Sequence, residues 1–158
     1  SQGSTPVMSR NLRLLLAGLQ AGMAGGLLVL IWLAAMSLFY RHTVWWVPNL
    51  YASTFFGDTA LRENLNKYTW SGMAFLLAQF AGFGALFAVL ARQDRDRLRA
   101  VALGILASIG WYYLTFHGLW KTFSPLMLLY SPDRPIFAGH LLFGVWLGRT
   151  PLYARRLE

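Results

Sequence analysis

Four long stretches of this chain contain no Asp, Glu, Lys or Arg. They cover residues 14–40, 69–91, 100–120 and 136–148, and are 27, 23, 21 and 13 residues long. A helix of about 20 residues crosses the roughly 30 Å hydrocarbon core of a bilayer. A charge at the centre of such a helix costs about 2.5–3.5 kcal/mol on insertion scales. The stretches therefore predict helices that span a membrane.

The composition leaves little for a separate water-soluble domain. Hydrophobic residues make up 56% of the 158 residues and charged residues 13%, against roughly 25% charged residues in an ordinary soluble domain. We expect one membrane domain over residues 1–158, an all-α bundle of four transmembrane helices. Its spans are predicted at about residues 14–40, 69–91, 100–120 and 136–152. The last either extends past Arg149, whose guanidinium would reach outward, or thins the bilayer locally.

The basic residues are unevenly distributed between the predicted loops. Nine of the 14 lie in the N-terminal segment, the turn at residues 92–99 and the C-terminal segment, and five lie in the other two loops. Because cytoplasmic loops carry the excess of Lys and Arg, we expect both termini in the cytoplasm of a bacterium, with the protein in its inner membrane. The net charge of +8 predicts contact with anionic membrane lipids and not with nucleic acid, since no aromatic–basic surface accompanies it.

The loop between the first two spans, residues 41–68, is long enough to carry structure of its own. Residues 50–56 are apolar but too short to cross a membrane. Asp58 or Thr59 can cap a short polar helix over residues 60–67. We expect a structured periplasmic loop with one interfacial piece and one solvent-facing piece.

Glycines recur at four-residue spacing on two predicted helices. Gly18, Gly22 and Gly26 follow this spacing in the first span, and Gly144 and Gly148 repeat it in the fourth. In lipid, helices associate through close backbone approach at small residues. These faces are predicted to pack against another helix, which belongs either to the same bundle or to a partner subunit.

Aromatic side chains gather at the predicted periplasmic ends of the spans. Belts of Trp and Tyr anchor helices at membrane interfaces, and the same rings also offer a large contact area at little entropic cost. The alternatives are an interfacial anchor or a docking surface for a larger membrane subunit, a lipid tail or a pigment ring. The candidate residues are Trp45, Trp46, Tyr51, Phe55, Phe56, Trp70, Trp111 and Trp120.

The three histidines are predicted to lie at a similar depth near the periplasmic side. His42 follows the first span, His117 lies near the end of the third, and His140 lies about one turn into the fourth. Three imidazoles could hold a metal, a haem or a chlorophyll-type pigment. The alternative is that His117 and His140 only pack and form hydrogen bonds with neighbouring hydroxyl or carbonyl groups.

Several motifs of this chain resemble those of small bacterial four-helix membrane proteins to which no activity is assigned. They are Trp-Trp-Val-Pro-Asn-Leu-Tyr-Ala-Ser-Thr-Phe-Phe-Gly at 45–57, Trp-Tyr-Tyr at 111–113, Tyr-Ser-Pro-Asp-Arg-Pro at 130–135 and Gly-His-Leu-Leu-Phe-Gly at 139–144. The resemblance extends over residues 14–153 and implies four spans. It implies no chemistry.

The sequence does not favour an enzyme. It has no Gly-rich phosphate loop, no supported Ser/His/Asp order, no paired histidine motif and no cysteine. The spans also lack the buried ionisable relay that proton-coupled transport uses. We therefore expect a non-catalytic accessory or scaffold subunit of a larger membrane complex. The alternatives are a cofactor- or lipid-binding membrane protein and a small oligomeric channel or transporter.

Overall fold

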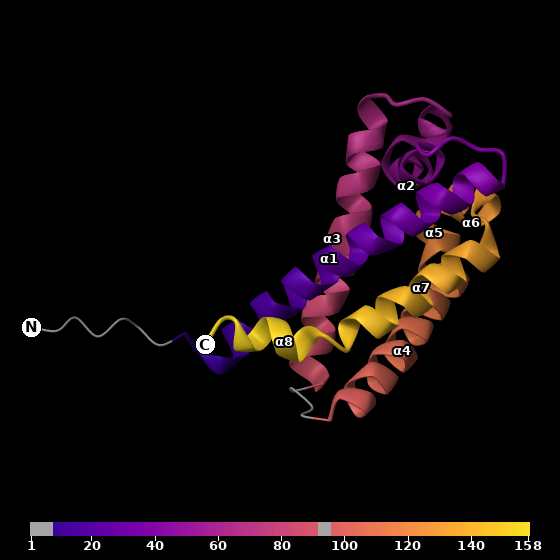
Figure 1. Ribbon diagram of the computed structural model, residues 1–158. Helices are drawn as coiled ribbons and strands as arrows, with labels where there is room; N and C mark the ends of the chain where they lie inside the picture. The colour runs from indigo at the N-terminus through magenta and orange to yellow at the C-terminus, as the bar shows by residue number, and fades with distance from the viewer. Residues whose placement is uncertain (1–7, 92–95) are drawn as a thin grey trace, which may run out of the picture.

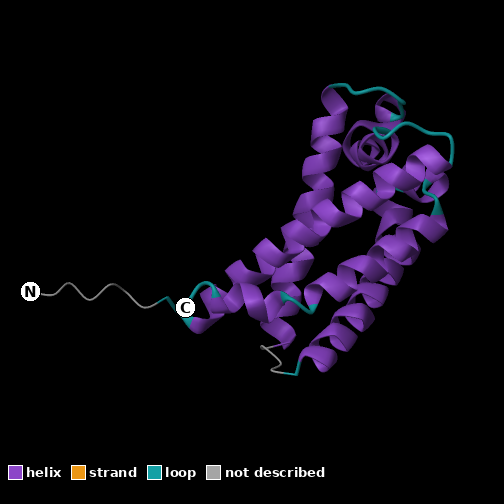
Figure 2. Cartoon of the chain, viewed as in Figure 1, coloured by secondary structure: helices purple, strands orange, loops and turns teal. Residues whose placement is uncertain are grey.

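The computed structural model describes residues 8–91 and 96–158, which are helical and contain no strand (Figures 1 and 2). Four long helices form the body of the molecule: α1 (Arg10–Phe39), α3 (Lys67–Ala91), α4 (Arg97–Leu114) and α7 (Asp133–Leu147). The shorter elements are α2 (Trp46–Phe56), the 3₁₀ turn η1 (Gly57–Ala60), the π-helix η2 (Thr115–Leu119), α5 (Trp120–Phe123), α6 (Pro125–Tyr130) and α8 (Thr150–Arg155). We call the end with α2, α5 and α6 the cap end, and the end where α1 begins and α8 lies the terminal end (Figure 1).

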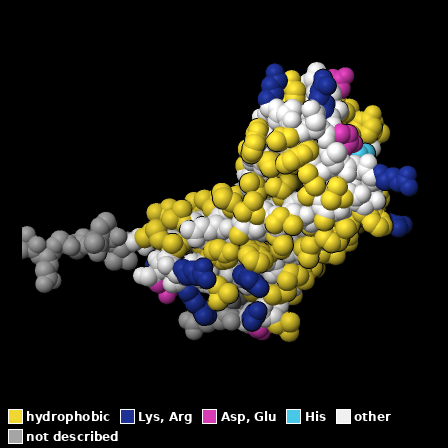
Figure 3. Space-filling model, turned by 45° about the horizontal axis from the view of Figure 1, so that its top comes forward, with side chains coloured by type: hydrophobic (Ala, Val, Ile, Leu, Met, Phe, Trp, Pro, Cys, Tyr) yellow, Lys and Arg dark blue, Asp and Glu magenta, His cyan; other side chains and the backbone are white. Residues whose placement is uncertain are grey.

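Three helices are long and apolar enough to cross a membrane. They are Arg10–Phe39, Lys67–Ala91 and the continuous helix Arg97–Phe123, which joins α4, η2 and α5. Figure 3 shows hydrophobic side chains along the sides of the molecule and basic side chains toward its two ends. These helices agree with the first three predicted spans.

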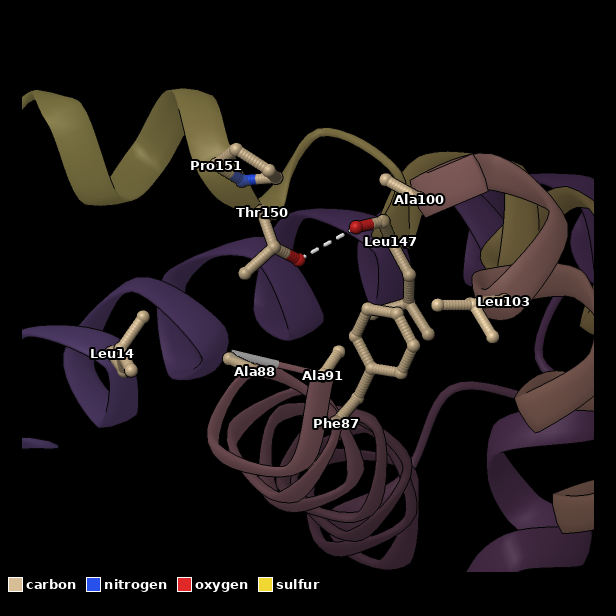
Figure 4. Close-up of a pocket in the computed structure, with 9 residues that line it drawn as sticks. All are labelled: Leu14, Phe87, Ala88, Ala91, Ala100, Leu103, Leu147, Thr150 and Pro151. Atoms are coloured by element: carbon tan, nitrogen blue, oxygen red, sulfur yellow. Dashed lines mark hydrogen bonds between the residues drawn. The ribbon is translucent and has the colours of Figure 1, made fainter. Parts of the chain in front are cut away.

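The fourth predicted span is not one helix to residue 152. Helix α7 ends at Leu147 and α8 begins at Thr150. Pro151 has no N–H to donate to the carbonyl of Leu147, and its ring would clash with that carbonyl in a continuous helix. Instead the hydroxyl of Thr150 donates to the Leu147 carbonyl at 2.6 Å, as Figure 4 shows. The prediction is wrong at this point, and Pro151 is its physical cause.

The long helices form two closely packed pairs. Helix α1 packs across α3, α7 packs along α4, and α1 and α7 join the two pairs (Figure 1). Helices α3 and α4 follow each other in the chain, yet they make few direct contacts. The bundle is therefore closed where α1 meets α7 and open between α3 and α4.

Glycines allow the backbones of α1 and α3 to approach each other. A Cβ atom added to Gly18 would lie 2.6 Å from the Cα of Ala85, and one added to Gly22 would lie 2.8 Å from the Cα of Ala81. Gly26 faces side chains of α3, with the nearest atom 3.1 Å from such a Cβ. This glycine face is occupied within the chain itself.

A second glycine face closes the pair formed by α4 and α7. A Cβ on Gly144 would lie 2.7 Å from the Cα of Ile105, and one on Gly148 would lie 3.0 Å from the Cα of Val101. The two pairs meet at the ring of Phe143, which lies 2.8 Å from the position of a Cβ on Gly25. Both predicted glycine faces therefore lie inside the fold.

At the cap end, the chain forms an ordered loop where the sequence predicted a short helix, and Asn49 of α2 holds this loop. Its side-chain amide donates to the carbonyls of Arg62 at 2.7 Å and Asn64 at 3.0 Å, and its carbonyl oxygen accepts from the hydroxyl of Thr69 at 2.6 Å. In a helix those two backbone carbonyls would accept from N–H groups four residues on. The prediction of a polar helix over residues 60–67 is thus wrong, because a buried side chain takes the carbonyls that such a helix needs.

Candidate functional site

His42 belongs to a network of hydrogen bonds that connects the end of α1 to the loop around Glu63 at the cap end. Its ring stacks on Trp46 with centroids 4.6 Å apart, and its Nδ1 lies 2.5 Å from a carboxylate oxygen of Glu63. The backbone N–H of Thr43 donates to the other carboxylate oxygen at 2.8 Å, and the Thr43 hydroxyl donates to the backbone carbonyl of Glu63. These contacts give His42 a structural role.

The carboxyl group of Glu63 makes this hydrogen-bond network sensitive to acid. Partial burial raises its pKa, but the bonds from Thr43 and His42 together lower the pKa further, so it lies below its usual value of 4.5. A depressed pKa stabilises the fold at pH values above the unfolded pKa, and this contribution is lost as the pH falls through the folded pKa.

We expect the loop to lose its order as the pH falls through the lowered pKa of Glu63, since its carboxylate then becomes protonated. Hydrogen-exchange protection factors of residues 57–66 should fall severalfold there while those of the long helices stay unchanged. Glu63→Gln should show the reduced protection already at pH 7. Equal protection of this variant and the wild type at pH 7 would show that the carboxylate does not hold the loop.

His117 and His140 lie in different surroundings from His42. His140 is 1% exposed, its Nδ1 donates to the carbonyl of Ile136 at 2.8 Å, and its ring lies 5.3 Å from that of Tyr112. His117 is exposed, and its ring lies 5.8 Å from the ring of the same Tyr112. Within residues 8–91 and 96–158, no three His, Cys, Asp or Glu side chains are grouped to hold a metal ion. The structure does not bring the three imidazoles together.

The largest cavity described here is a groove between α3 and the α4–α5 helix. It has a volume of about 430 Å³, and none of its lining residues belongs to α1 or α7. The groove therefore lies on the side of the bundle away from the contact between α1 and α7. Phe55 of α2 lies at its cap end. We call it the α3–α4 groove. Its principal lining residues are Ala78, Gln79, Gly82 and Phe83 on α3, and Trp111 and Trp120 on the facing helix.

Small residues on α3 keep this groove open. Helix α3 uses Ala81 and Ala85 on one side for its contact with α1. On the other side, Ala78 and Gly82 are exposed, and a Cβ added to Gly82 would meet no atom within 4 Å. One side of α3 therefore packs against α1, and the side that carries Ala78 and Gly82 is exposed.

Aromatic rings make the walls of the groove rigid and flat. Phe83 of α3 stacks on Trp111 of α4 with centroids 4.9 Å apart and planes at 18°, and Phe75 meets Trp120 edge-on at 5.9 Å. The π-helix η2 lies between the two tryptophans, and the hydroxyl of Thr115 donates to the Trp111 carbonyl at 2.9 Å. Single-turn π-helices within α-helices are frequent at functional sites.

Polar atoms without partners lie behind these apolar walls. Both amide atoms of Gln79 and the indole Nε1 atoms of Trp111 and Trp120 are buried without a hydrogen bond from any described residue. Trp120 as a whole is only 6% exposed. A buried polar group without a partner costs free energy, and three residues that line this one cavity carry such groups.

A second cavity, at the terminal end, is a packing void. It has a volume of about 20 Å³ and lies where α1, α3, α4, α7 and α8 converge (Figure 4). That volume is enough for about one water molecule. The hydroxyl of Thr150, a polar group on its wall, is already bonded to the Leu147 carbonyl. The void offers no chemistry of its own.

The predicted aromatic residues do not form one external surface. Tyr51 is 1% exposed, whereas Trp70, Phe55 and Phe56 are exposed and Trp45 and Trp46 are half-buried. Trp111, Trp120 and Phe55 line the groove. Gln79, which sequence reasoning did not single out as a site, could have been noticed as an amide in an uncharged stretch.

Comparison of the chain with protein-family models, with curated proteins and with solved structures finds no match.

Proposed function

We propose that this protein binds an apolar molecule dissolved in the membrane, in the α3–α4 groove, and catalyses no reaction on it. The observation that carries this proposal is the groove itself, which lies between two helices long and apolar enough to cross a membrane. Its volume of about 430 Å³ lies within the roughly 300–1,000 Å³ of small-molecule sites. A ligand would enter from the lipid without passing through water.

The proposal places the protein in the inner membrane of a bacterium with four crossings. Helix α7 supplies the fourth crossing beside the three long apolar helices. The excess of basic residues near the termini and at residues 92–99 supports a cytoplasmic terminal end and a periplasmic cap end. The groove then opens toward the hydrocarbon core between the two leaflets.

Filling the groove from α3 tests this function. Gly82→Leu adds a side chain where a Cβ meets open space, so the helix tolerates it while the added side chain narrows the groove. Gly110→Leu is the matched control, because Gly110 is also exposed with no atom within 4 Å of an added Cβ, but does not line the groove. We expect lipid extracts of the purified wild type and of Gly110→Leu to contain an enriched apolar compound that is at least about tenfold depleted in Gly82→Leu.

The proposal fails if mass spectrometry finds the same lipid composition in all three proteins and in the surrounding membrane. Retention of one compound by Gly82→Leu at the wild-type level would place its binding site outside the groove.

An accessory subunit of a larger membrane complex is the second candidate function. Ala74, Ala78 and Gly82 are exposed at four-residue spacing on α3, which is a surface where a helix of another subunit can approach closely. Ala74 does not line the groove. Under this function Ala74→Leu releases a larger subunit that co-purifies with the wild type in mild detergent, while Gly110→Leu retains it. Isolation of the wild type without any stoichiometric partner contradicts it.

A further inference from the structure

The unpartnered polar atoms around the α3–α4 groove have a common requirement. An indole N–H can only donate, so Trp111 and Trp120 each need an acceptor. The amide of Gln79 adds two more donor hydrogens and one acceptor oxygen. None of these atoms has a partner among the described residues. Donors therefore outnumber acceptors at this place, and the missing complement is a hydrogen-bond acceptor.

The position of Gln79 along its helix limits which kind of molecule can supply this acceptor. Gln79 is near the middle of α3, which runs from Lys67 to Ala91. Trp111, which lines the groove opposite α3, lies within the long helix Arg97–Phe123. Water is scarce at such a depth in a bilayer, so the acceptor has to come from an otherwise apolar molecule.

A carbonyl oxygen meets both conditions. It has two lone pairs and no hydrogen to donate, and it is carried by membrane-dissolved ring compounds as well as by lipid esters. The stacked pair Phe83–Trp111, with planes 18° apart, offers a flat wall on which a planar ring can lie. Phospholipid esters lie nearer the headgroups than the middle of a spanning helix, which favours a ring ketone or quinone.

On the basis of the function proposed above, we propose that the molecule held in the α3–α4 groove is a ring ketone or quinone that presents a carbonyl oxygen to the side-chain amide of Gln79. The Gln79 amide lies behind the apolar wall in the free protein. Glutamine has three side-chain torsions, so the amide turns into the groove when the carbonyl arrives, while the backbone of α3 stays in place.

Binding by three probes tests this assignment on the full chain in detergent micelles. The probes are a decyl-substituted benzoquinone, decylbenzene, which has the same ring and tail but no carbonyl, and dioctanoylglycerol, which has ester carbonyls. Dissociation constants come from the rise of the unfolding temperature with probe concentration. We expect the wild type to bind the quinone at least about tenfold more tightly than decylbenzene.

Gln79→Met removes the amide at nearly constant volume and should bind the quinone and decylbenzene alike. Without any probe it should also unfold at a higher temperature than the wild type, because an unpartnered buried amide is gone. The matched control is Gln20→Met, since Gln20 lies exposed on α1 away from the groove, and it should keep the wild-type preference.

The outcomes separate this proposal from the one on which it rests. Equal binding of quinone and decylbenzene by the wild type, abolished by Gly82→Leu, overturns the carbonyl assignment and leaves the groove as an apolar site. Tightest binding of dioctanoylglycerol, lost in Gln79→Met, overturns the assignment to a ring carbonyl and places a lipid ester in the groove. Failure of the wild type to bind any of the three overturns both proposals.

Discussion

Gly22→Ala is expected to destabilise the folded protein by about 3 kcal/mol or more, the upper range of overpacking effects. The added methyl carbon would lie 2.8 Å from the Cα of Ala81 and would also meet the carbonyl oxygen of Phe80. Both are backbone atoms, so no side chain can move aside, and α1 and α3 must separate along their whole crossing. Unfolding in detergent with increasing denaturant measures the loss.

Gly110→Ala is the matched control for this substitution. Gly110 also lies in a helix, but a Cβ there meets no atom within 4 Å. Alanine in place of a helix-interior glycine stabilises by about 0.5–1 kcal/mol, so the two variants should shift the unfolding midpoint in opposite directions. Equal midpoints for Gly22→Ala and the wild type would contradict the α1–α3 crossing described above.

Asn49→Leu is the second substitution with a large expected effect. The side chain of Asn49 is fully buried and holds the carbonyls of Arg62 and Asn64 and the hydroxyl of Thr69. Leucine has a similar size but leaves these groups without that partner, at about 1–3 kcal/mol for each one that water cannot reach. We expect a loss of about 2–4 kcal/mol in unfolding free energy, with the loop at residues 61–66 losing hydrogen-exchange protection first.

Asn64→Ala distinguishes this effect from a general sensitivity of the loop. Asn64 is exposed and accepts the bond from Asn49 through its backbone carbonyl, which alanine retains. Its expected effect is within about 0.5 kcal/mol. If Asn49→Leu also stays within that range, the side chain of Asn49 does not organise the loop.

The first three apolar helices could be predicted because the constraint that produces them is local. A run of more than 20 uncharged residues is visible in the sequence without knowledge of its neighbours, and the structure has helices over those runs. The end of the fourth helix depended on a competition between the uncharged run and Pro151. Helix geometry decides that competition in favour of the proline.

The neighbours of the histidines and the lining of the groove could not be predicted from the sequence. The depth of a residue in a spanning helix can be estimated by counting, but the direction in which it points depends on how helices pack and on irregular segments such as the π-helix η2. His42 and His140 therefore have unrelated neighbours. Gln79 was visible in the sequence, whereas its position in one groove with Trp111 and Trp120 depends on how α3 and the α4–α5 helix lie side by side.

The interruption between α7 and α8 has a consequence for the bilayer around the protein. The 15 residues of α7 rise about 22 Å, some 8 Å less than the roughly 30 Å of hydrocarbon that a crossing helix has to match. In the proposed four-crossing arrangement, lipids beside α7 have to shorten to meet it, at a fraction of a kcal/mol for each ångström. The mismatch favours residence in thin membranes and gives the protein one flank where the bilayer is pinched.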